Sequence, residues 1–146
     1  MTTAKGADSH IVPLELKLHR RSRELSVRFA DGATFRIPCE LLRIYSPSAE
    51  VRGHAPEQRK LVTGKKYVNV ESLDRIGNYA VRIVFDDGHD TGIYSWQYLR
   101  ELGEQQAQLW EQYAADLKIA NASRLPSIPL TQAVGQWQPR DDEQPP

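Results

Sequence analysis

A short pattern that occurs twice, 56 residues apart, constrains the fold of this chain most. Residues 27–32 read Val-x-Phe-x-Asp-Gly, and residues 83–88 read Ile-x-Phe-x-Asp-Gly. Apolar residues at every second position indicate a half-buried strand. An Asp-Gly pair between two such strands is a strong signal for a β-hairpin. The sequence therefore predicts two antiparallel hairpins of similar construction.

Each hairpin is followed by residues that favour a short helix. Leu42-Arg43 after the first hairpin matches Leu99-Arg100 after the second if one residue is inserted, and Ile37 on the first return strand matches Ile93. An earlier alternating segment, residues 14–18, adds a strand before the first hairpin, and residues 67–70 begin one before the second. Ser95 is predicted to cap the second helix and Gly103 to end it. The predicted core comprises Leu25, Val27, Phe29, Ile37, Leu42, Val68, Val81, Ile83, Phe85, Ile93, Trp96 and Leu99.

The predicted fold class is α+β, with two antiparallel hairpin or meander units, each followed by a short helix. Residues 1–13 are expected to be a flexible N-terminus and residues 14–103 the folded domain. A C-terminal helix is predicted over 104–120 from apolar residues at Leu109, Tyr113 and Leu117. Residues 121–146 are expected to be a disordered tail, and residues 44–66 a long, polar, basic loop.

Composition excludes several classes of protein. The longest apolar runs are far shorter than the ~20 residues that a membrane helix needs. The first ten residues contain no apolar segment typical of a secretory signal, and Cys39 is the single cysteine. A cytoplasmic protein without a membrane association is therefore expected.

The 146-residue chain has no net charge, but its basic residues are concentrated in its first half. Residues 1–75 hold 14 basic and 9 acidic residues, whereas residues 76–146 hold 5 and 10. A basic face can bind nucleic acid, but it can equally be a solvated strand face and loop. Nucleic-acid binding is the less favoured interpretation because the chain is not basic overall. The basic stripe comprises Lys17, Arg20, Arg21, Arg23 and Arg28, and the basic cluster comprises Arg52, His54, Arg59, Lys60, Lys65 and Lys66.

Two residues raise the question of chemistry. His89 lies at the predicted tip of the second hairpin, within Asp86-Asp87-Gly88-His89-Asp90. With nearby carboxylates it is a candidate metal ligand or general base, but the same residues fit an ordinary turn in which Asp binds its own backbone. Cys39 is a candidate nucleophile if His89 approaches it, although a small buried hydrophobe is the favoured interpretation. The candidate ligand residues are His89, Asp87, Asp90 and His54.

Three runs resemble a known family: Leu42-Arg43, residues 46–51 (Ser-Pro-Ser-Ala-Glu-Val) and residues 77–96, the most specific of the three. Residues 14 to 103 are similar to the N-terminal domain of γ-butyrobetaine hydroxylase, which also occurs alone in small bacterial proteins of unknown function. A related domain is joined to a P-loop iron–sulfur carrier of plant plastids. The resemblance implies docking to another protein, and it suggests a link to iron–sulfur protein assembly.

The resemblance also implies a metal site that this sequence does not keep. In the hydroxylase the domain binds zinc through three cysteines and one histidine. The positions of the cysteines are occupied here by Ser46, Ser48 and Val51, and only His89 is retained. Structural zinc needs four nitrogen or sulfur ligands, so no zinc and no other cofactor is predicted. The resemblance does not extend to the catalytic 2-oxoglutarate dioxygenase domain, so hydroxylase activity is not expected.

The leading functional prediction is therefore a non-enzymatic accessory or protein-interaction domain with an unidentified protein partner. A homodimer is an alternative. Two other functions stay open: a metal- or small-ligand-binding protein or enzyme that uses His89, and nucleic-acid binding through the basic loop. The candidate interaction surface comprises Arg43, Arg52, Arg59, Lys60, Lys65, Lys66, Trp96, Trp110 and Trp137.

Overall fold

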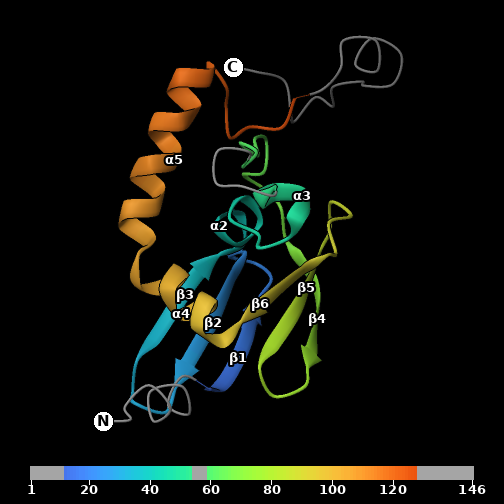
Figure 1. The fold of residues 1–146 in the computed structure, drawn as a ribbon, viewed down its shortest axis with the longest axis vertical. Coiled ribbons are helices and arrows are strands. Elements are labelled where there is room, and N and C mark those ends of the chain that lie inside the picture. The colour runs from blue at the N-terminus through green and yellow to red at the C-terminus, as the bar shows by residue number, and fades with distance from the viewer. Residues whose placement is uncertain (1–11, 54–58, 128–146) are drawn as a thin grey trace, which may run out of the picture.

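The fold is α+β and contains two three-stranded antiparallel sheets, each followed by helices, as the sequence predicts (Figure 1). It was obtained as a computed structural model, which describes residues 12–53 and 59–127. The first sheet consists of β1 (Pro13–His19), β2 (Glu24–Phe29) and β3 (Thr34–Pro38), followed by α2 (Cys39–Ile44) and α3 (Ala49–Arg52). The second consists of β4 (Val70–Ile76), β5 (Ala80–Phe85) and β6 (Gly92–Ser95), followed by α4 (Trp96–Glu104) and α5 (Gln106–Ala120). Within the described residues, no helix is long and apolar enough to cross a membrane.

The two hairpin tips have the same local structure. Gly32 and Gly88 both have positive φ angles, +92° and +95°, which glycine adopts without a steric penalty. The Asp31 carboxylate accepts a hydrogen bond from the Ala33 amide at 3.1 Å, and Asp87 does the same for the His89 amide at 3.0 Å. The repeated Asp-Gly pair therefore specifies the same turn twice.

After the tips the two hairpins differ by one residue. Val27 pairs with Phe35, but Ile83, 56 positions later, pairs with Gly92, which is 57 positions after Phe35. A shift of one residue moves every side chain of a strand to the opposite face. Tyr94 thus takes the buried place of Ile37 and is fully covered, whereas Ile93 is 47% exposed. The prediction that Ile93 belongs to the core is wrong.

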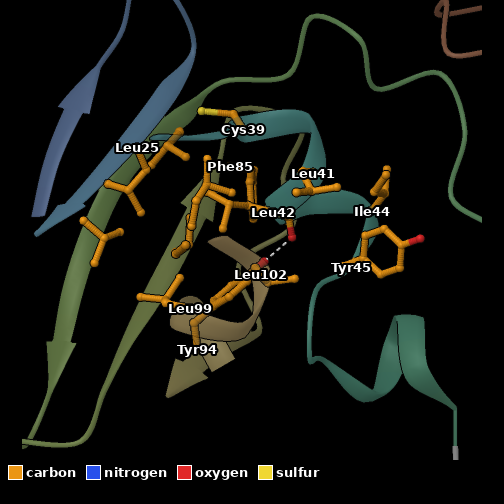
Figure 2. Close-up of a cluster of buried hydrophobic side chains, with 14 of the residues drawn as sticks. Leu25, Cys39, Leu41, Leu42, Ile44, Tyr45, Phe85, Tyr94, Leu99 and Leu102 are labelled. Carbon is orange, nitrogen blue, oxygen red and sulfur yellow. Dashed lines mark hydrogen bonds between the residues drawn. The ribbon is translucent and has the colours of Figure 1, made fainter. Parts of the chain in front are cut away.

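The core lies between the two units and receives side chains from both sheets and from α2, α4 and α5 (Figure 2). Cys39 begins α2 and is fully buried, and the Tyr94 hydroxyl donates a hydrogen bond to the Leu42 carbonyl across the unit boundary. Eleven of the twelve predicted core residues are buried: Leu25, Val27, Phe29, Ile37, Leu42, Val68, Val81, Ile83, Phe85, Trp96 and Leu99.

The helices confirm one predicted boundary and correct another. The Ser95 hydroxyl accepts a hydrogen bond from the Tyr98 amide at 3.1 Å and caps α4. The helix does not end at Gly103, however, but continues to Glu104. Gly103 is needed for packing instead, because a Cβ atom there would lie 2.5 Å from Cγ of Phe35.

Residues 121–127, predicted as the start of the tail, turn back onto the loop before β4. Asn121 ends α5 in the left-handed conformation, and the Gly64 and Lys66 amides donate to the carbonyls of Ser123 and Arg124 at 3.0 Å. Arg124 also binds the Glu40 carboxylate with contacts of 2.7–3.2 Å. The loop predicted over 44–66 contains α3, so it is not wholly irregular. His54 and Trp137 lie outside the described residues.

Candidate functional site

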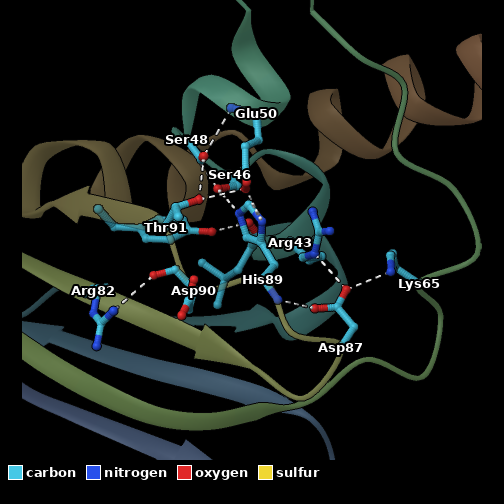
Figure 3. Close-up of polar contacts among 12 residues, drawn as sticks. Arg43, Ser46, Ser48, Glu50, Lys65, Arg82, Asp87, His89, Asp90 and Thr91 are labelled. Carbon is cyan, nitrogen blue, oxygen red and sulfur yellow. Dashed lines mark hydrogen bonds and ion pairs between the residues drawn. The ribbon is translucent and has the colours of Figure 1, made fainter.

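The chain after α2 meets the tip of the β5–β6 hairpin, and polar side chains from both segments bond there (Figure 3). Ser46 Oγ lies 2.9 Å from His89 Nε2, and Ser48 Oγ lies 2.7 Å from Thr91 Oγ1. Thr91 in turn donates to Glu50 Oε1 at 2.9 Å, and the same oxygen lies 3.4 Å from His89 Nδ1. We call Ser46, Ser48, Glu50, His89 and Thr91 the hydroxyl–imidazole cluster.

The bonds of the cluster form a consistent order of donors and acceptors. The Ser48 amide donates to Ser46 Oγ at 3.2 Å. Nδ1 of His89 faces the Glu50 carboxylate at 3.4 Å, and in the tautomer with its proton on Nδ1 the Nε2 atom accepts from the Ser46 hydroxyl. The Glu50 amide donates to Ser48 Oγ at 3.1 Å, and the Ser48 hydroxyl donates to Thr91. In this tautomer each hydroxyl both accepts and donates.

The surroundings of His89 favour its neutral form. Burial is the main cause that lowers the pKa of His89, the nearby Arg43 guanidinium lowers it further, and Glu50, Asp87 and Asp90 oppose the shift. A neutral imidazole is required if Nε2 is to accept the Ser46 proton. The electrostatics of the junction and its hydrogen bonds therefore favour the same state.

A serine, a histidine and a glutamate in this order resemble the atoms of a hydrolytic triad, but the environment does not allow hydrolysis. Ser46 is 1% exposed and His89 7% exposed, so a substrate cannot reach the hydroxyl. Cys39 is also unsuitable as a nucleophile, because burial raises the pKa of its thiol to about 11. Its Sγ atom contacts the Asn69 side chain at 3.8 Å, while His89 is bonded to Ser46.

The cluster does not fit the zinc that the resemblance implies. Ser46 and Ser48 supply hydroxyls and Val51 supplies a buried apolar side chain, so the thiolates are missing. His89 Nε2 is already hydrogen-bonded to Ser46 Oγ. Asp90 accepts a hydrogen bond from Arg82 through its backbone carbonyl. Within residues 12–53 and 59–127, no group of three or more His, Cys, Asp or Glu side chains is placed to hold a metal ion.

The Asp residues of the two tips form reciprocal ion pairs between the units. Asp87 of the second hairpin binds Arg43 of α2 at 2.8 Å, and Asp31 of the first hairpin binds Arg100 of α4 at 2.7 Å. Lys65 also binds Asp87, at 2.7 Å. Burial alone would raise the pKa of Asp87, but Lys65, the His89 amide and Arg43 together lower it to about 2. Asp87 is thus a structural counterion at the unit boundary.

Several residues of the predicted interaction surface have partners within the fold. Arg43 and Lys65 both bind the Asp87 carboxylate. The Trp96 indole is buried and donates to the Asn78 carbonyl at 2.7 Å. Trp110 lies beneath the Arg124 guanidinium, with 5.3 Å between the guanidinium carbon and the ring centroid.

Two other predicted residues, Arg52 and Arg59, have aromatic partners. The Arg59 guanidinium carbon lies 4.0 Å from the centroid of the Tyr45 ring, and Arg52 lies 4.9 Å from that of Tyr98. The Tyr98 hydroxyl donates to the Tyr45 carbonyl and connects the two stacks. Among the described residues, no carboxylate forms an ion pair with either arginine. We call Tyr45, Arg52, Arg59 and Tyr98 the Arg–Tyr surface.

The basic stripe is partly used within the fold. Arg20 donates to the carbonyls of Val70 and Glu71 at 3.0 and 2.8 Å, which joins the turn after β1 to β4. Arg28 lies 3.7 Å from the Glu15 carboxylate. Lys17 and Arg21 are exposed. The stripe therefore offers fewer free cations than its sequence indicates.

Comparisons with known proteins agree with the resemblance. The sequence model of the family described as "Gamma-butyrobetaine hydroxylase-like, N-terminal" matches residues 16–100, more than half of the chain. Two solution structures determined by NMR share 53% and 40% sequence identity with this chain, each with a TM-score of 0.69. They match 81% and 82% of this chain and 88% and 94% of their own.

A crystal structure from Acidithiobacillus ferrooxidans, of a DUF971-family protein with unknown function, is 40% identical to this chain. It has a TM-score of 0.55 and covers 64% of this chain and 94% of its own. No curated protein matches. On the family match and these similar structures, the chain belongs to the γ-butyrobetaine hydroxylase-like N-terminal domain family.

Proposed function

We propose that this chain is a non-enzymatic interaction domain that binds an acidic segment of a partner protein through the Arg–Tyr surface. The observation that carries the proposal is the pair of guanidinium groups stacked on tyrosine rings without a carboxylate partner among the described residues. A stacked guanidinium has already lost part of its side-chain freedom, so binding a carboxylate costs less entropy. Arginine and tyrosine are also enriched among the residues that dominate binding energies at interfaces.

The burial of the reactive side chains supports a binding role over catalysis. Ser46, His89 and Cys39 are buried. Ser46 and His89 are hydrogen-bonded to each other, and burial raises the pKa of the Cys39 thiol. A catalytic group must come within hydrogen-bond reach of its substrate. Arg52 and Arg59, by contrast, have exposed side chains. The accessible chemistry of this region is therefore recognition of anions.

The class of partner follows from charge and from the resemblance. Two arginines on linked tyrosine rings favour a segment rich in Asp or Glu, because a planar guanidinium binds carboxylates through charge-assisted hydrogen bonds; Arg59 also donates from Nη2 to the Ile44 carbonyl at 3.3 Å. The related domain on a P-loop iron–sulfur carrier makes a protein of iron–sulfur assembly the partner to test first. This part of the proposal is an analogy between family members.

The experiment compares two double variants with the same change in charge. Arg52→Glu/Arg59→Glu reverses the Arg–Tyr surface, and Lys17→Glu/Arg21→Glu reverses two exposed cations elsewhere. Each variant is used to isolate partners from the cells in which the protein occurs, and recovery is measured by quantitative mass spectrometry. A photoreactive residue replaces Leu61, which is 37% exposed and close in sequence to Arg59, to identify contacts at this face.

Under the proposal, one protein with an acidic segment crosslinks at position 61, and its recovery falls at least tenfold in the Arg52/Arg59 variant only. Equal recovery by both variants would refute the proposal. Crosslinking to a second copy of this chain would replace it with self-association. Binding to an oligonucleotide at low salt that both variants weaken equally would favour the nucleic-acid interpretation instead.

A further inference from the structure

We propose that the hydroxyl–imidazole cluster is a metal-independent clasp that closes the junction between the α2–α3 segment and the β5–β6 tip, in place of a bound metal ion. The proposal goes beyond the interaction function and does not depend on it. It rests on the connectivity of the cluster, on the shortness of α3 and on a difference between the two hairpins.

The clasp joins segments that are far apart in the sequence. The pairs Ser46–His89 and Ser48–Thr91 each connect residues 43 positions apart, and Thr91–Glu50 connects residues 41 apart. Figure 3 shows these side chains between α3 and the hairpin tip. The Ser46–His89 bond is buried and does not compete with water, whereas the Ser48–Thr91 bond is partly buried and the Thr91–Glu50 bond is exposed. Three bonds at one junction therefore act as a crosslink between the units.

The local structure of α3 depends on this crosslink. The helix has four residues, which is too few for a stable isolated helix. The Glu50 amide in its first turn donates to the Ser48 hydroxyl, which is itself bonded to Thr91. The capping group of α3 is thus held in place by the hairpin of the other unit.

The first hairpin lacks the same device. The two tips share the Asp-Gly turn and the reciprocal Asp–Arg pair, but Ala33 occupies the place that His89 occupies in the second tip. The extra residue of the second hairpin follows His89, between the turn and β6. The ion pairs are common to both tips, whereas the clasp is an addition to one of them.

The donor set explains why the clasp excludes a metal. A hydroxyl and a neutral imidazole satisfy each other through one hydrogen bond, whereas a structural zinc needs thiolates or imidazoles with free lone pairs. In this chain Nε2 of His89 is hydrogen-bonded to Ser46 Oγ at 2.9 Å. Three of the four positions that the resemblance associates with zinc, Ser46, Ser48 and His89, thus belong to a hydrogen-bonded network, and the fourth, Val51, is a buried apolar residue.

Amide hydrogen exchange tests the structural role. In Ser46→Ala/Thr91→Val, we expect the amides of residues 45–53 to exchange at least tenfold faster than in the unmodified protein. Ser26→Ala is the matched control, because Ser26 Oγ forms a comparable bond of 2.7 Å with His19 Nε2 in the first sheet. In Ser26→Ala the amides of residues 45–53 should exchange at the rate of the unmodified protein. If they exchange at that rate in Ser46→Ala/Thr91→Val as well, the proposed clasp is refuted.

Metal ions test the second half of the proposal. The unfolding temperature of the unmodified protein should stay within 1 °C when EDTA or Zn²⁺ is added at tenfold excess, and a larger fall with EDTA would refute metal independence. Ser46→Cys/Ser48→Cys/Val51→Cys restores the thiolates and is titrated with Co²⁺ as a spectroscopic probe. A thiolate-to-cobalt absorption band at one equivalent of Co²⁺ supports the proposal that the hydroxyl–imidazole cluster occupies the place of a metal site. A folded variant without that band contradicts this proposal.

Discussion

The ion pairs at the Asp87 carboxylate predict a measurable loss of stability when its charge is removed. Asp87→Asn keeps the size of the side chain and an oxygen for the His89 amide, but it leaves Arg43 and Lys65 without a counterion. The pKa of Asp87 is lowered from 3.8 to about 2, a shift that corresponds to roughly 2 kcal/mol of stabilisation by the charged form. We expect Asp87→Asn to lose this amount at pH 7, measured by urea unfolding.

The pH dependence has a defined sign. Because the pKa of Asp87 is lower in the folded state, its contribution is complete above the unfolded value of 3.8 and is lost as the pH falls towards about 2. The difference in unfolding free energy between the two proteins should therefore be constant from pH 7 to pH 5. It should shrink steadily between pH 4 and pH 2. A difference that does not depend on pH would show that the amide acts by distorting the turn and not by losing its charge.

Asp31→Asn is the control because Asp31 occupies the same turn of the first hairpin and binds Arg100 in the same way. The Asp31 side chain is 44% exposed, compared with 16% for Asp87, and within the described part of the chain Arg100 is its one cationic partner. Solvent screens exposed pairs, so the control should lose clearly less stability. Equal losses in the two variants, or a loss below 0.5 kcal/mol in Asp87→Asn, would refute the electrostatic account.

Three further changes have expected outcomes. Cys39 should not react with a thiol reagent at pH 8 until urea unfolds the protein, because its thiol is buried and its pKa is about 11; rapid reaction in buffer would contradict this burial. Gly103→Ala should lower the unfolding free energy by about 1–2 kcal/mol despite the higher helix propensity of alanine, since the new methyl group overlaps Phe35; calorimetry measures the loss, and increased stability would show that Phe35 moves aside. Tyr113→Phe removes a hydroxyl that donates to the Val62 carbonyl at 2.7 Å and should cost about 0.5–1.5 kcal/mol in urea unfolding, whereas no change would show that water replaces the bond.

The hairpins and the core were predictable because they depend on local patterns. The Asp-Gly turns need a residue that adopts positive φ at one place, and alternating apolar residues identify the buried face of a strand. Ser95 was also recognisable as a helix cap. The Arg–Tyr surface was predicted only in part, since Arg52 and Arg59 stand out as charges but no spacing marks Tyr45 and Tyr98 as their partners.

The hydroxyl–imidazole cluster could not be derived from spacing alone. Its residues come from two segments more than 40 positions apart, and the resemblance brought Ser46, Ser48 and His89 together only as the positions of missing zinc ligands. Glu50 and Thr91 each lie two positions after a residue that was singled out, Ser48 and His89. That they bond to each other depends on how the units pack, which no local pattern specifies.

One inserted residue accounts for both the main error of the sequence prediction and the asymmetry of the site. Aligning the hairpins through Ile37 and Ile93 leaves the insertion in the following helix, where Leu42 and Leu99 are 57 positions apart. The strand register places it earlier, between His89 and β6. The extra residue turns Tyr94 inward, and the Tyr94 hydroxyl then reaches the Leu42 carbonyl. It also lengthens the hairpin tip, on which Thr91 lies within hydrogen-bond distance of Ser48. Two units built on one pattern can therefore share reciprocal ion pairs, while a change in the length of one tip supplies a contact that the other does not make.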